Sequence, residues 1–208
     1  MFYLEQKKDL RIIKTDKNIR NTFIQLLNEK DFHSITVQDL LDRALINRST
    51  FYKHYSDKFE LAEAIAKDFL DEFESFARFK FSNHEDFDLL MKKLDIIIEK
   101  FYEQRLLILG LWKIRTEKVN VYEDMKTILK QQYIMYYVSR VKGNCNINFH
   151  ACIFASVALT TLSFMMENKE IYTAHELIEE LQKYYSIISI DLPKVVSSDE
   201  KMIRRLDD

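Results

Sequence analysis

The fold is decided by residues 35–61, which read ITVQDLLDRALINRSTFYKHYSDKFEL. Near the start of this stretch, Thr36 followed by Asp39 resembles a capping box, which predicts the beginning of a short helix. Asn47 is a good N-cap residue and predicts a second short helix that runs through His54. Only about three residues separate the two helices, so a tight turn must join them. Helices this short do not persist alone and must pack against a shared core.

Longer helices flank this pair. Thr15 or Asp16 can cap a preceding helix, and Ser56 or Asp57 can cap a following helix that runs to about Phe79. Two short helices separated by a tight turn, behind a longer helix, form a helix-turn-helix unit. Apolar residues at helical spacing are expected to supply its core, namely Ile19, Phe23, Leu40, Ile46, Phe51 and Tyr55.

The rest of the chain repeats this pattern of capped, amphipathic helices. Only two Gly and one Pro occur in 208 residues, which disfavours a sheet protein with many tight hairpins. Five further helices are predicted, beginning near Ser82 (with Glu85), Arg105, Asn120, Asn146 or Asn148, and Thr173 (with Glu176). Gly143 can end the third of these, and Pro193 ends regular structure. The predicted fold is all-α with about nine helices: a three-helix, homeodomain-like helix-turn-helix domain (residues 1–58), a larger helical domain (59–192) and a mobile tail (193–208).

Charge is distributed unevenly along the chain. Residues 1–58 hold 11 basic and 8 acidic residues, whereas the remainder holds 20 basic and 25 acidic residues. A mildly basic front on an acidic body is typical of a nucleic-acid reader attached to a larger module. Scatter of surface charge can also produce an excess of three, so this bias is weak evidence by itself.

Several classes of protein lack their sequence signatures here. We find no phosphate-binding glycine loop, nucleophile elbow, paired histidines on one helix face or quartet of metal ligands. The sequence therefore predicts no enzymatic activity, no cofactor and no metal. Cys145 and Cys152 flank His150 at a spacing that matches no standard zinc pattern, which favours reduced structural thiols over a zinc site.

The sequence also predicts no contact with a membrane. The most apolar stretch, from about Cys152 to Met166, is broken by Ser and Thr, and the N-terminus lacks the plan of a signal peptide. A cytoplasmic location is expected.

The second short helix carries polar side chains suited to DNA. Arg48, Ser49 and Thr50 lie at its N-terminal end, the part of such a helix that enters the major groove, and Arg48 suits bidentate hydrogen bonding to guanine. Tyr52 and Lys53 follow and suit contacts to phosphates. Any one of these residues is also explained as an ordinary solvated side chain. Their combination with a tight turn and an inward aromatic pair favours DNA binding.

Residues 46–61, INRSTFYKHYSDKFEL, resemble the signature of the TetR family of transcriptional regulators, V-x-x-x-T-[LF]-Y-x-[HY]-[FY]-x-x-K-x-x-L. The residues that meet this pattern are Ile46 (in place of Val), Thr50, Phe51, Tyr52, His54, Tyr55, Lys58 and Leu61. The preceding ITVQDLLDRA is similar to the family's second helix. The resemblance spans about Thr15 to Leu61, and beyond it only the length and the number of helices are similar.

This resemblance implies a set of DNA-binding residues. Base contacts are implied for Arg48, Ser49 and Thr50, and phosphate contacts for Tyr52, Lys53, His54, Lys58, Thr36, Val37 and Gln38. One departure is Leu45, because the family usually has Gly in this turn; Leu45 must adopt a left-handed conformation or the turn must differ. Before Thr15, a group of cations forms either a basic arm that adds salt-sensitive affinity or a frayed terminus: Lys7, Lys8, Arg11 and Lys14.

For the helical body, the resemblance implies a homodimer on a palindromic double-stranded operator and a pocket for a small-molecule effector. The expected dimer interface comprises Ala155, Leu159, Leu177, Leu181, Tyr184 and Ile188. The expected pocket lining comprises Phe101, Tyr102, Trp112, Tyr133, Tyr136, Tyr137, Phe154 and Met165, each of which is also explained as ordinary core.

The chain is thus predicted to be a DNA-binding repressor that an effector releases from its operator. One alternative is a TetR-like regulator or co-activator whose body docks a protein partner. Another is a dimeric scaffold that does not bind DNA.

Overall fold

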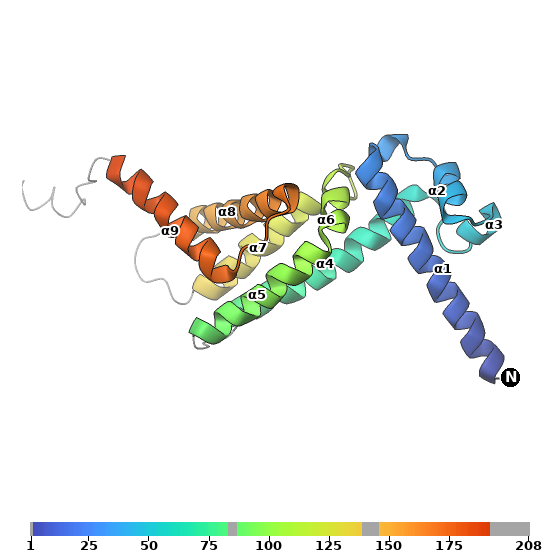
Figure 1. Ribbon diagram of the computed structural model, residues 1–208, viewed down its shortest axis with the longest axis horizontal. Coiled ribbons are helices and arrows are strands. Elements are labelled where there is room, and N and C mark those ends of the chain that lie inside the picture. The colour runs from blue at the N-terminus through green and yellow to red at the C-terminus, as the bar shows by residue number, and fades with distance from the viewer. Residues whose placement is uncertain (1, 83–86, 139–145, 192–208) are drawn as a thin grey trace, which may run out of the picture. The chain divides into compact units, whose positions relative to one another are not determined.

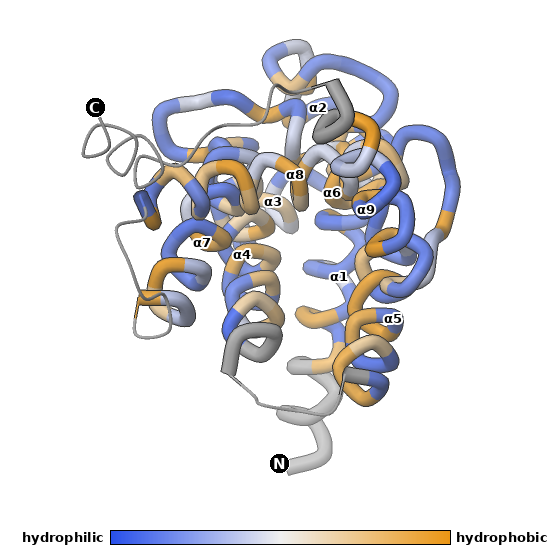
Figure 2. Tube along the Cα trace, turned by 90° about the vertical axis from the view of Figure 1, so that its left-hand side faces the viewer, coloured by the Kyte–Doolittle hydropathy of each residue, from blue (hydrophilic) through white to orange (hydrophobic). Residues whose placement is uncertain are grey.

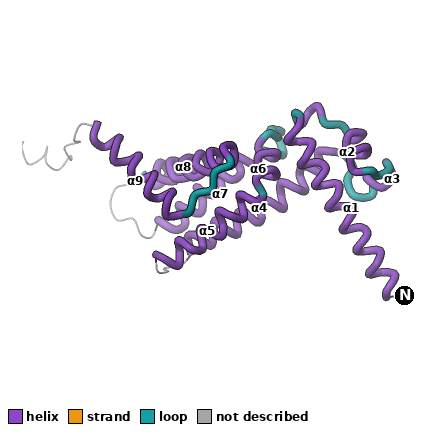
Figure 3. The backbone as a smooth tube through the Cα atoms, viewed as in Figure 1, coloured by secondary structure: helices purple, strands orange, loops and turns teal. Residues whose placement is uncertain are grey.

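The computed structural model describes residues 2–82, 87–138 and 146–191. Over these residues the chain forms nine α-helices and one turn of 3₁₀ helix, without a strand (Figure 3). The helices are α1 (Phe2–Glu29), α2 (Val37–Ala44), α3 (Arg48–Phe51), α4 (Lys58–Ser82), α5 (Phe87–Glu103), α6 (Arg105–Trp112), α7 (Val121–Tyr137), α8 (Ile147–Asn168) and α9 (Ala174–Asp191). The 3₁₀ turn covers Phe32–Ser34. The prediction of an all-α fold is confirmed.

The predicted helix starts of the N-terminal unit depend on side-chain caps. The Thr36 hydroxyl accepts a hydrogen bond from the Asp39 N–H, and the Asp39 carboxylate accepts one from the Thr36 N–H, so the capping box is complete. Asn47 caps α3 through the Thr50 N–H. The Asp57 carboxylate accepts from two N–H groups in the first turn of α4. These caps are confirmed.

The start of α1 differs from the prediction. We expected a cap at Thr15 or Asp16, but the helix begins at Phe2. Within it, the Thr15 hydroxyl donates to the Arg11 carbonyl one turn earlier. The Asp16 carboxylate accepts from Tyr55 and Arg20 instead of capping the helix. Neither side chain is available to end the helix, so it continues toward the N-terminus.

A continuous core joins the N-terminal unit to the body. Phe23, Leu27 and Phe51 have no exposed surface in the first, and Leu111 and Met125 have none in the second. Helix α1 packs on α2 and α6, while α7 packs on α4 and α8 (Figure 1). Figure 2 shows hydrophobic and hydrophilic residues alternating along α4 and α5, as expected of helices that bury one face.

Helix α6 approaches α1 closely at Gly110. A Cβ atom placed on this buried glycine would lie 3.2 Å from the Leu27 Cβ and 3.3 Å from the Asn28 Nδ2. The Asn28 amide also donates to the Leu106 carbonyl at 2.8 Å, and the Lys113 ammonium donates to the Leu27 carbonyl at 3.0 Å. These contacts attach the C-terminal end of α1 firmly to the body.

The chain divides into two compact units, residues 1–171 and 172–208, and the second contains α9. The predicted capping box of α9 is present, because Thr173 and Glu176 exchange hydrogen bonds. Helix α8 is, by length and composition, the one described helix apolar enough to cross a membrane, and 28% of its most apolar window is buried, including Ala151, Ala155 and Leu159. Predictions that concern Glu85, Gly143, Cys145 and residues 193–208 lie outside the described residues.

Candidate nucleic-acid interface

Helix α3 is built by its N-cap. The Asn47 Oδ1 atom accepts from the Thr50 N–H at 2.8 Å, from the Thr50 hydroxyl at 2.7 Å and from the Ser49 hydroxyl at 2.8 Å. Each hydroxyl therefore donates its one proton to Asn47, and the lone pairs of its oxygen remain available as acceptors. Ser49 and Thr50 can therefore accept hydrogen bonds from an external donor, such as an exocyclic amino group of a base.

Residues 48–55, which contain α3 and the turn after it, are called the α3 segment. Their side chains separate into an inner and an outer set. Phe51 is fully buried and Tyr55 is 6% exposed, whereas Arg48, Ser49, Tyr52 and Lys53 are exposed. The Tyr52 ring is 48% exposed and packs edge-to-face on Phe51, with ring centroids 5.5 Å apart. The outer set thus presents one guanidinium, one ammonium and two hydroxyl-bearing side chains on a rigid support.

Tyr55 anchors this segment to α1 and α4. Its hydroxyl donates to the Asp16 carboxylate at 2.5 Å and accepts from the Arg20 Nε at 2.9 Å. Arg20 in turn pairs with Asp68 of α4 at 2.6 Å. Burial, together with the hydrogen bond to Asp16, raises the pKa of Tyr55 to about 12. This chain of contacts links the end of the α3 segment to the long helix of the body.

His54 is less available than predicted. Only 12% of its side chain is exposed, and its Nδ1 atom lies 3.6 Å from the Asp16 carboxylate. The ring faces α1, so the expected phosphate contact requires the side chain to turn outward.

Lys58 also occupies another position than predicted. Its ammonium donates to the carbonyl oxygens of Phe32, His33 and Ile35, at 2.9, 2.9 and 2.6 Å. It also lies over the rings of Phe32 and Phe59. Burial lowers the pKa of Lys58. Because all three protons are used inside the protein, the predicted phosphate contact does not fit this geometry, and Lys58 instead holds the Phe32–Ser34 turn against α4.

The beginning of α2 lies at the surface. Thr36 and Gln38 are exposed and Val37 is half-buried. The Gln38 amide donates to Asp42 at 2.7 Å, and Asp39 pairs with Lys30 at 2.7 Å. The Lys30 ammonium, followed by the Thr36 N–H and hydroxyl, lowers the pKa of Asp39 to about 2. Thr36 and Gln38 can therefore reach a ligand at the surface. The ion pair between Lys30 and Asp39 stabilises the cap at the start of α2.

The turn between α2 and α3 contains the departure seen in the sequence. Leu45 ends α2 in the left-handed conformation, with φ 54° and ψ 43°, and its side chain is 90% exposed. Of the two possibilities left open by the sequence, the structure has the left-handed Leu. Such a conformation favours Gly because a Cβ atom crowds the following carbonyl.

The cations of residues 10–65 form two groups. One group is used internally: Arg20, Lys30 and Arg43 in ion pairs, and Lys58 on carbonyl oxygens. The other group has no ion-pair partner among the described side chains and consists of Arg11, Lys14, Lys17, Arg48 and Lys53. All five of these side chains are exposed, and they lie between residues 11 and 17 of α1 or on the α3 segment.

The residues predicted to line an effector pocket separate into several groups. On α7, the Tyr137 ring contacts those of Tyr133 and Tyr136, with centroids 4.4 and 4.8 Å apart, and Tyr133 contacts Phe154 of α8 at 5.2 Å. Phe101 packs on other phenylalanine rings, 5.7 Å from Phe73. The Trp112 ring packs on Tyr122, Met165 is 2% exposed, and Tyr102 is half-buried. The structure brings the four aromatic side chains of α7 and α8 together, and their role in an effector pocket stays a prediction.

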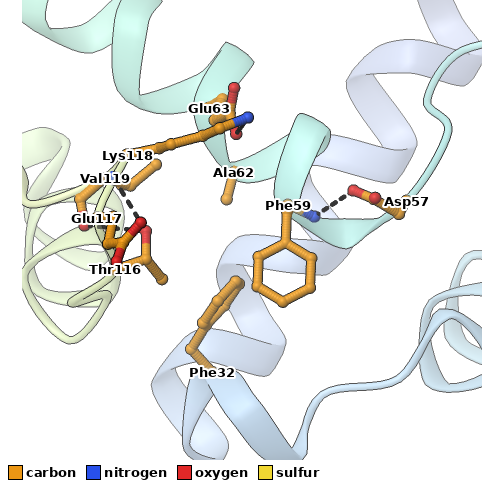
Figure 4. Close-up of a pocket in the computed structure, with 9 residues that line it drawn as sticks. All are labelled: Phe32, Asp57, Phe59, Ala62, Glu63, Thr116, Glu117, Lys118 and Val119. Carbon is orange, nitrogen blue, oxygen red and sulfur yellow. Dashed lines mark hydrogen bonds and ion pairs between the residues drawn. The ribbon is translucent and has the colours of Figure 1, made fainter.

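A cavity of about 360 Å³ lies elsewhere, at the start of α4 (Figure 4). Its lining residues are Phe32, Asp57, Phe59, Ala62, Glu63, Thr116, Glu117, Lys118 and Val119. None of the predicted pocket residues is among them. Sequence reasoning missed this cavity because its walls come from segments far apart in the chain, and only the exposed Phe59 beside Asp57 stands out locally.

The predicted dimer interface is corrected on α8. Ala155 and Leu159 are 0% and 1% exposed in the core of their own chain, so they cannot meet a partner. The exposed apolar residues of that helix are Phe149, Ile153 and Phe164, which recur at helical spacing. On α9, Leu177 and Leu181 are half-buried and Tyr184 is 55% exposed, while the Ile188 side chain lies outside the described residues.

A tight turn, a capped short helix with an exposed polar face, and an attached helical body define the class of helix-turn-helix regulatory proteins. The family model of the bacterial regulatory proteins of the tetR family matches residues 21–65. The chain is similar to the structure of a TetR transcriptional regulator from Streptococcus agalactiae, with 25% identity and a TM-score of 0.59, over 85% of this chain and 96% of that one. Residues 21–65 therefore match the DNA-binding part of the tetR family, and the chain has the fold of a TetR transcriptional regulator.

Other relatives are similar over different lengths. The uncharacterized HTH-type transcriptional regulator YxbF of Bacillus subtilis is 36% identical over 62 residues, which are 29% of this chain and 16% of that protein. The HTH-type dhaKLM operon transcriptional activator DhaS of Lactococcus lactis is 37% identical over 60 residues, which are 29% of this chain and 30% of that protein. The chain thus spans less than a third of either relative. A TetR-family structure from Syntrophomonas wolfei has the same fold at 17% identity, with a TM-score of 0.61 over 88% of this chain and 98% of that one.

Proposed function

We propose that this protein is a sequence-specific DNA-binding transcriptional regulator that acts as a homodimer in the cytoplasm. The observation that carries the proposal is the outer face of the α3 segment. Arg48 and Lys53 are exposed cations without an ion-pair partner among the described side chains, and Tyr52 stands between them, on a helix anchored from behind by Phe51 and Tyr55. Arg48 reads a guanine, while Tyr52 and Lys53 contact phosphates.

Ser49 and Thr50 add acceptors to this surface, and Thr36, Val37 and Gln38 flank it at the start of α2. We remove Lys58 from the set, because its ammonium is saturated by carbonyl oxygens. Its role is to hold the turn that supports α2.

Two copies are required because one short helix reads too few bases. In a two-fold dimer the two α3 segments contact half-sites about 34–36 Å apart, and the operator is palindromic. We assign the interface to α9, through Leu177, Leu181 and Tyr184. Leu181→Arg with Tyr184→Arg should convert a dimer into a monomer in light scattering, and a monomeric wild-type protein would contradict the assignment.

DNA binding is tested by selecting bound sequences from a random duplex pool. The selected duplex is then titrated in a fluorescence anisotropy assay. We expect saturable, salt-dependent binding to a two-fold sequence, with weaker binding of a scrambled duplex. Tyr52→Ala or Lys53→Ala should weaken binding to both duplexes while leaving the dimer intact. Equal binding of both duplexes by the wild type would contradict sequence-specific recognition.

For regulation, we propose a repressor that a small molecule releases from its operator. The aromatic group of Tyr133, Tyr136, Tyr137 and Phe154 supports an apolar effector in the body. The contacts from Tyr55 through Arg20 to Asp68 of α4 offer a route by which the body can bias the α3 segment. Ligand-induced increases in Tm across a metabolite panel, accompanied by release of the operator, would support this regulation.

The second candidate is an activator whose body docks a protein. The similarity to DhaS, named as a transcriptional activator, favours it, as do Leu89 and Ile96, exposed apolar residues seven positions apart on α5. A reporter gene that rises with this protein, together with silence in the metabolite panel, would favour activation. A reporter that falls, with release by a metabolite, would favour repression.

A further inference from the structure

The N-terminal half of α1 extends beyond the helix-turn-helix unit. At its C-terminal end, Asn28 and Leu27 are bonded to the body through Leu106 and Lys113. In its middle, Asn18 donates to the Ala44 carbonyl at 2.8 Å. Residues before Thr15 therefore lie past α2 and α3 on the side away from α6, where Figure 1 shows no other helix beside them.

Two cations on this extension share a face with Asn18. Lys14 and Arg11 precede Asn18 by four and seven residues, the spacing that places side chains in one row on a helix. Asn18 marks the direction of that row, because its amide reaches the last residue of α2, immediately before the turn that leads into α3. At a rise of about 1.5 Å per residue, Arg11 lies roughly 10 Å along the helix from this point.

Among the described side chains, none forms an ion pair with these two charges. Both side chains are exposed and have no ion-pair partner among the described residues, whereas Arg20, on the same helix, is held by Asp16 and Asp68. Arg48 and Lys53 of the α3 segment are similarly unpaired. The unpaired cations thus continue from the helix that faces DNA onto the neighbouring helix.

We propose that Arg11 and Lys14 bind the phosphate backbone of DNA outside the base pairs that α3 contacts. Helix α1 is then a second DNA-binding element, and its contribution does not depend on the base sequence. The inference rests on the proposed function and enlarges its DNA footprint. Double-stranded DNA is the occupant that matches Arg11 and Lys14, because both are cationic and their row on α1 leads away from Asn18, which contacts α2 beside the α2–α3 turn. The proposed phosphate contacts do not involve the side chains of residues 2–9.

The test compares two double variants. Arg11→Gln/Lys14→Gln removes both charges, and Gln preserves helix propensity. The matched control, Lys67→Gln/Lys92→Gln, removes two exposed cations of α4 and α5 that likewise lack an ion-pair partner among the described residues. Affinity for the selected operator and for a scrambled duplex is measured between about 50 and 200 mM salt.

Each phosphate contact contributes about 0.9 to the slope of log K against log salt, and a dimer loses two contacts in each protomer, so the Arg11/Lys14 variant should reduce the magnitude of the slope by about 3.6. Its affinity should fall by the same factor for both duplexes, and the control should behave like the wild type. A wild-type slope in the Arg11/Lys14 variant would overturn the proposal while leaving the proposed function intact. So would an equal loss of slope in the control, or a changed oligomeric state in the Arg11/Lys14 variant. A wild-type protein that shows no saturable binding would instead overturn the proposed function itself.

Discussion

Replacement of Leu45 by Gly should stabilise the protein. Leu45 is held at φ 54° and ψ 43° with its side chain 90% exposed, so its removal sacrifices almost no buried apolar surface. A left-handed conformation costs an L-residue about 1–2 kcal/mol, while the extra freedom of Gly in the unfolded chain costs about 0.5–1 kcal/mol. The net gain is about 0.5–1 kcal/mol, which raises Tm by roughly 1–4 °C in a chain of this length.

Differential scanning calorimetry of the free protein measures this change. Lys169→Gly is the matched control, because Lys169 has the same conformation at the end of α8, with φ 59° and ψ 33°. It should be stabilised by a similar amount. Lys67→Gly, in the interior of α4, should instead be destabilised by about 1 kcal/mol. A lower Tm for Leu45→Gly, with a higher Tm for Lys169→Gly, would refute the view that the α2–α3 turn is strained.

Three further substitutions test contacts that hold the DNA-binding unit. Lys58→Met should cost about 1–3 kcal/mol in urea unfolding, because three carbonyl oxygens lose their donor. Asp39→Asn should cost about 0.5–2 kcal/mol at neutral pH through loss of the charged cap. Because the pKa of Asp39 is lowered to about 2, the wild-type advantage is complete above the ordinary Asp pKa and disappears as pH falls through about 2. Gly110→Ala should cost about 1 kcal/mol, since overpacking against the Leu27 Cβ at 3.2 Å outweighs the gain in helix propensity.

Each of these has an outcome that would contradict its physical reason. Unchanged stability of Lys58→Met would mean that the ammonium is free to meet phosphate after all. A constant difference between wild type and Asp39→Asn from pH 7 to pH 2 would exclude the carboxylate charge as the cause. A stabilised Gly110→Ala would show that α1 and α6 can separate by a few tenths of an ångström at little cost.

Local features of the DNA-binding unit were readable from the sequence. The caps at Thr36 and Asn47 depend on residues three positions apart, whereas for Leu45 the sequence left a left-handed residue and a different turn as alternatives, of which the structure has the first. The inward positions of Phe51 and Tyr55 follow from helical spacing. These predictions succeeded because the partners lie within a few residues of each other.

Features that depend on distant partners were not readable. Lys58 was assigned to phosphate because its acceptors, the carbonyls of Phe32, His33 and Ile35, lie 23 to 26 residues upstream. The N-cap expected at Asp16 failed because that carboxylate binds Tyr55, 39 residues away. Ala155 was assigned to the wrong face of α8, because a nearly all-apolar helix has no polar stripe to reveal which side is buried.

Chemical protection of the selected operator is the most direct test of the claim that Arg48 contacts a guanine in the major groove. Dimethyl sulfate methylates guanine N7 in the major groove, the atom that a bidentate guanidinium covers. The wild-type protein should protect one guanine in each half-site, and Arg48→Ala, bound at saturation, should leave the same guanines reactive. Protection that is identical in the two proteins, or absent from both, would contradict the placement of α3 in the groove.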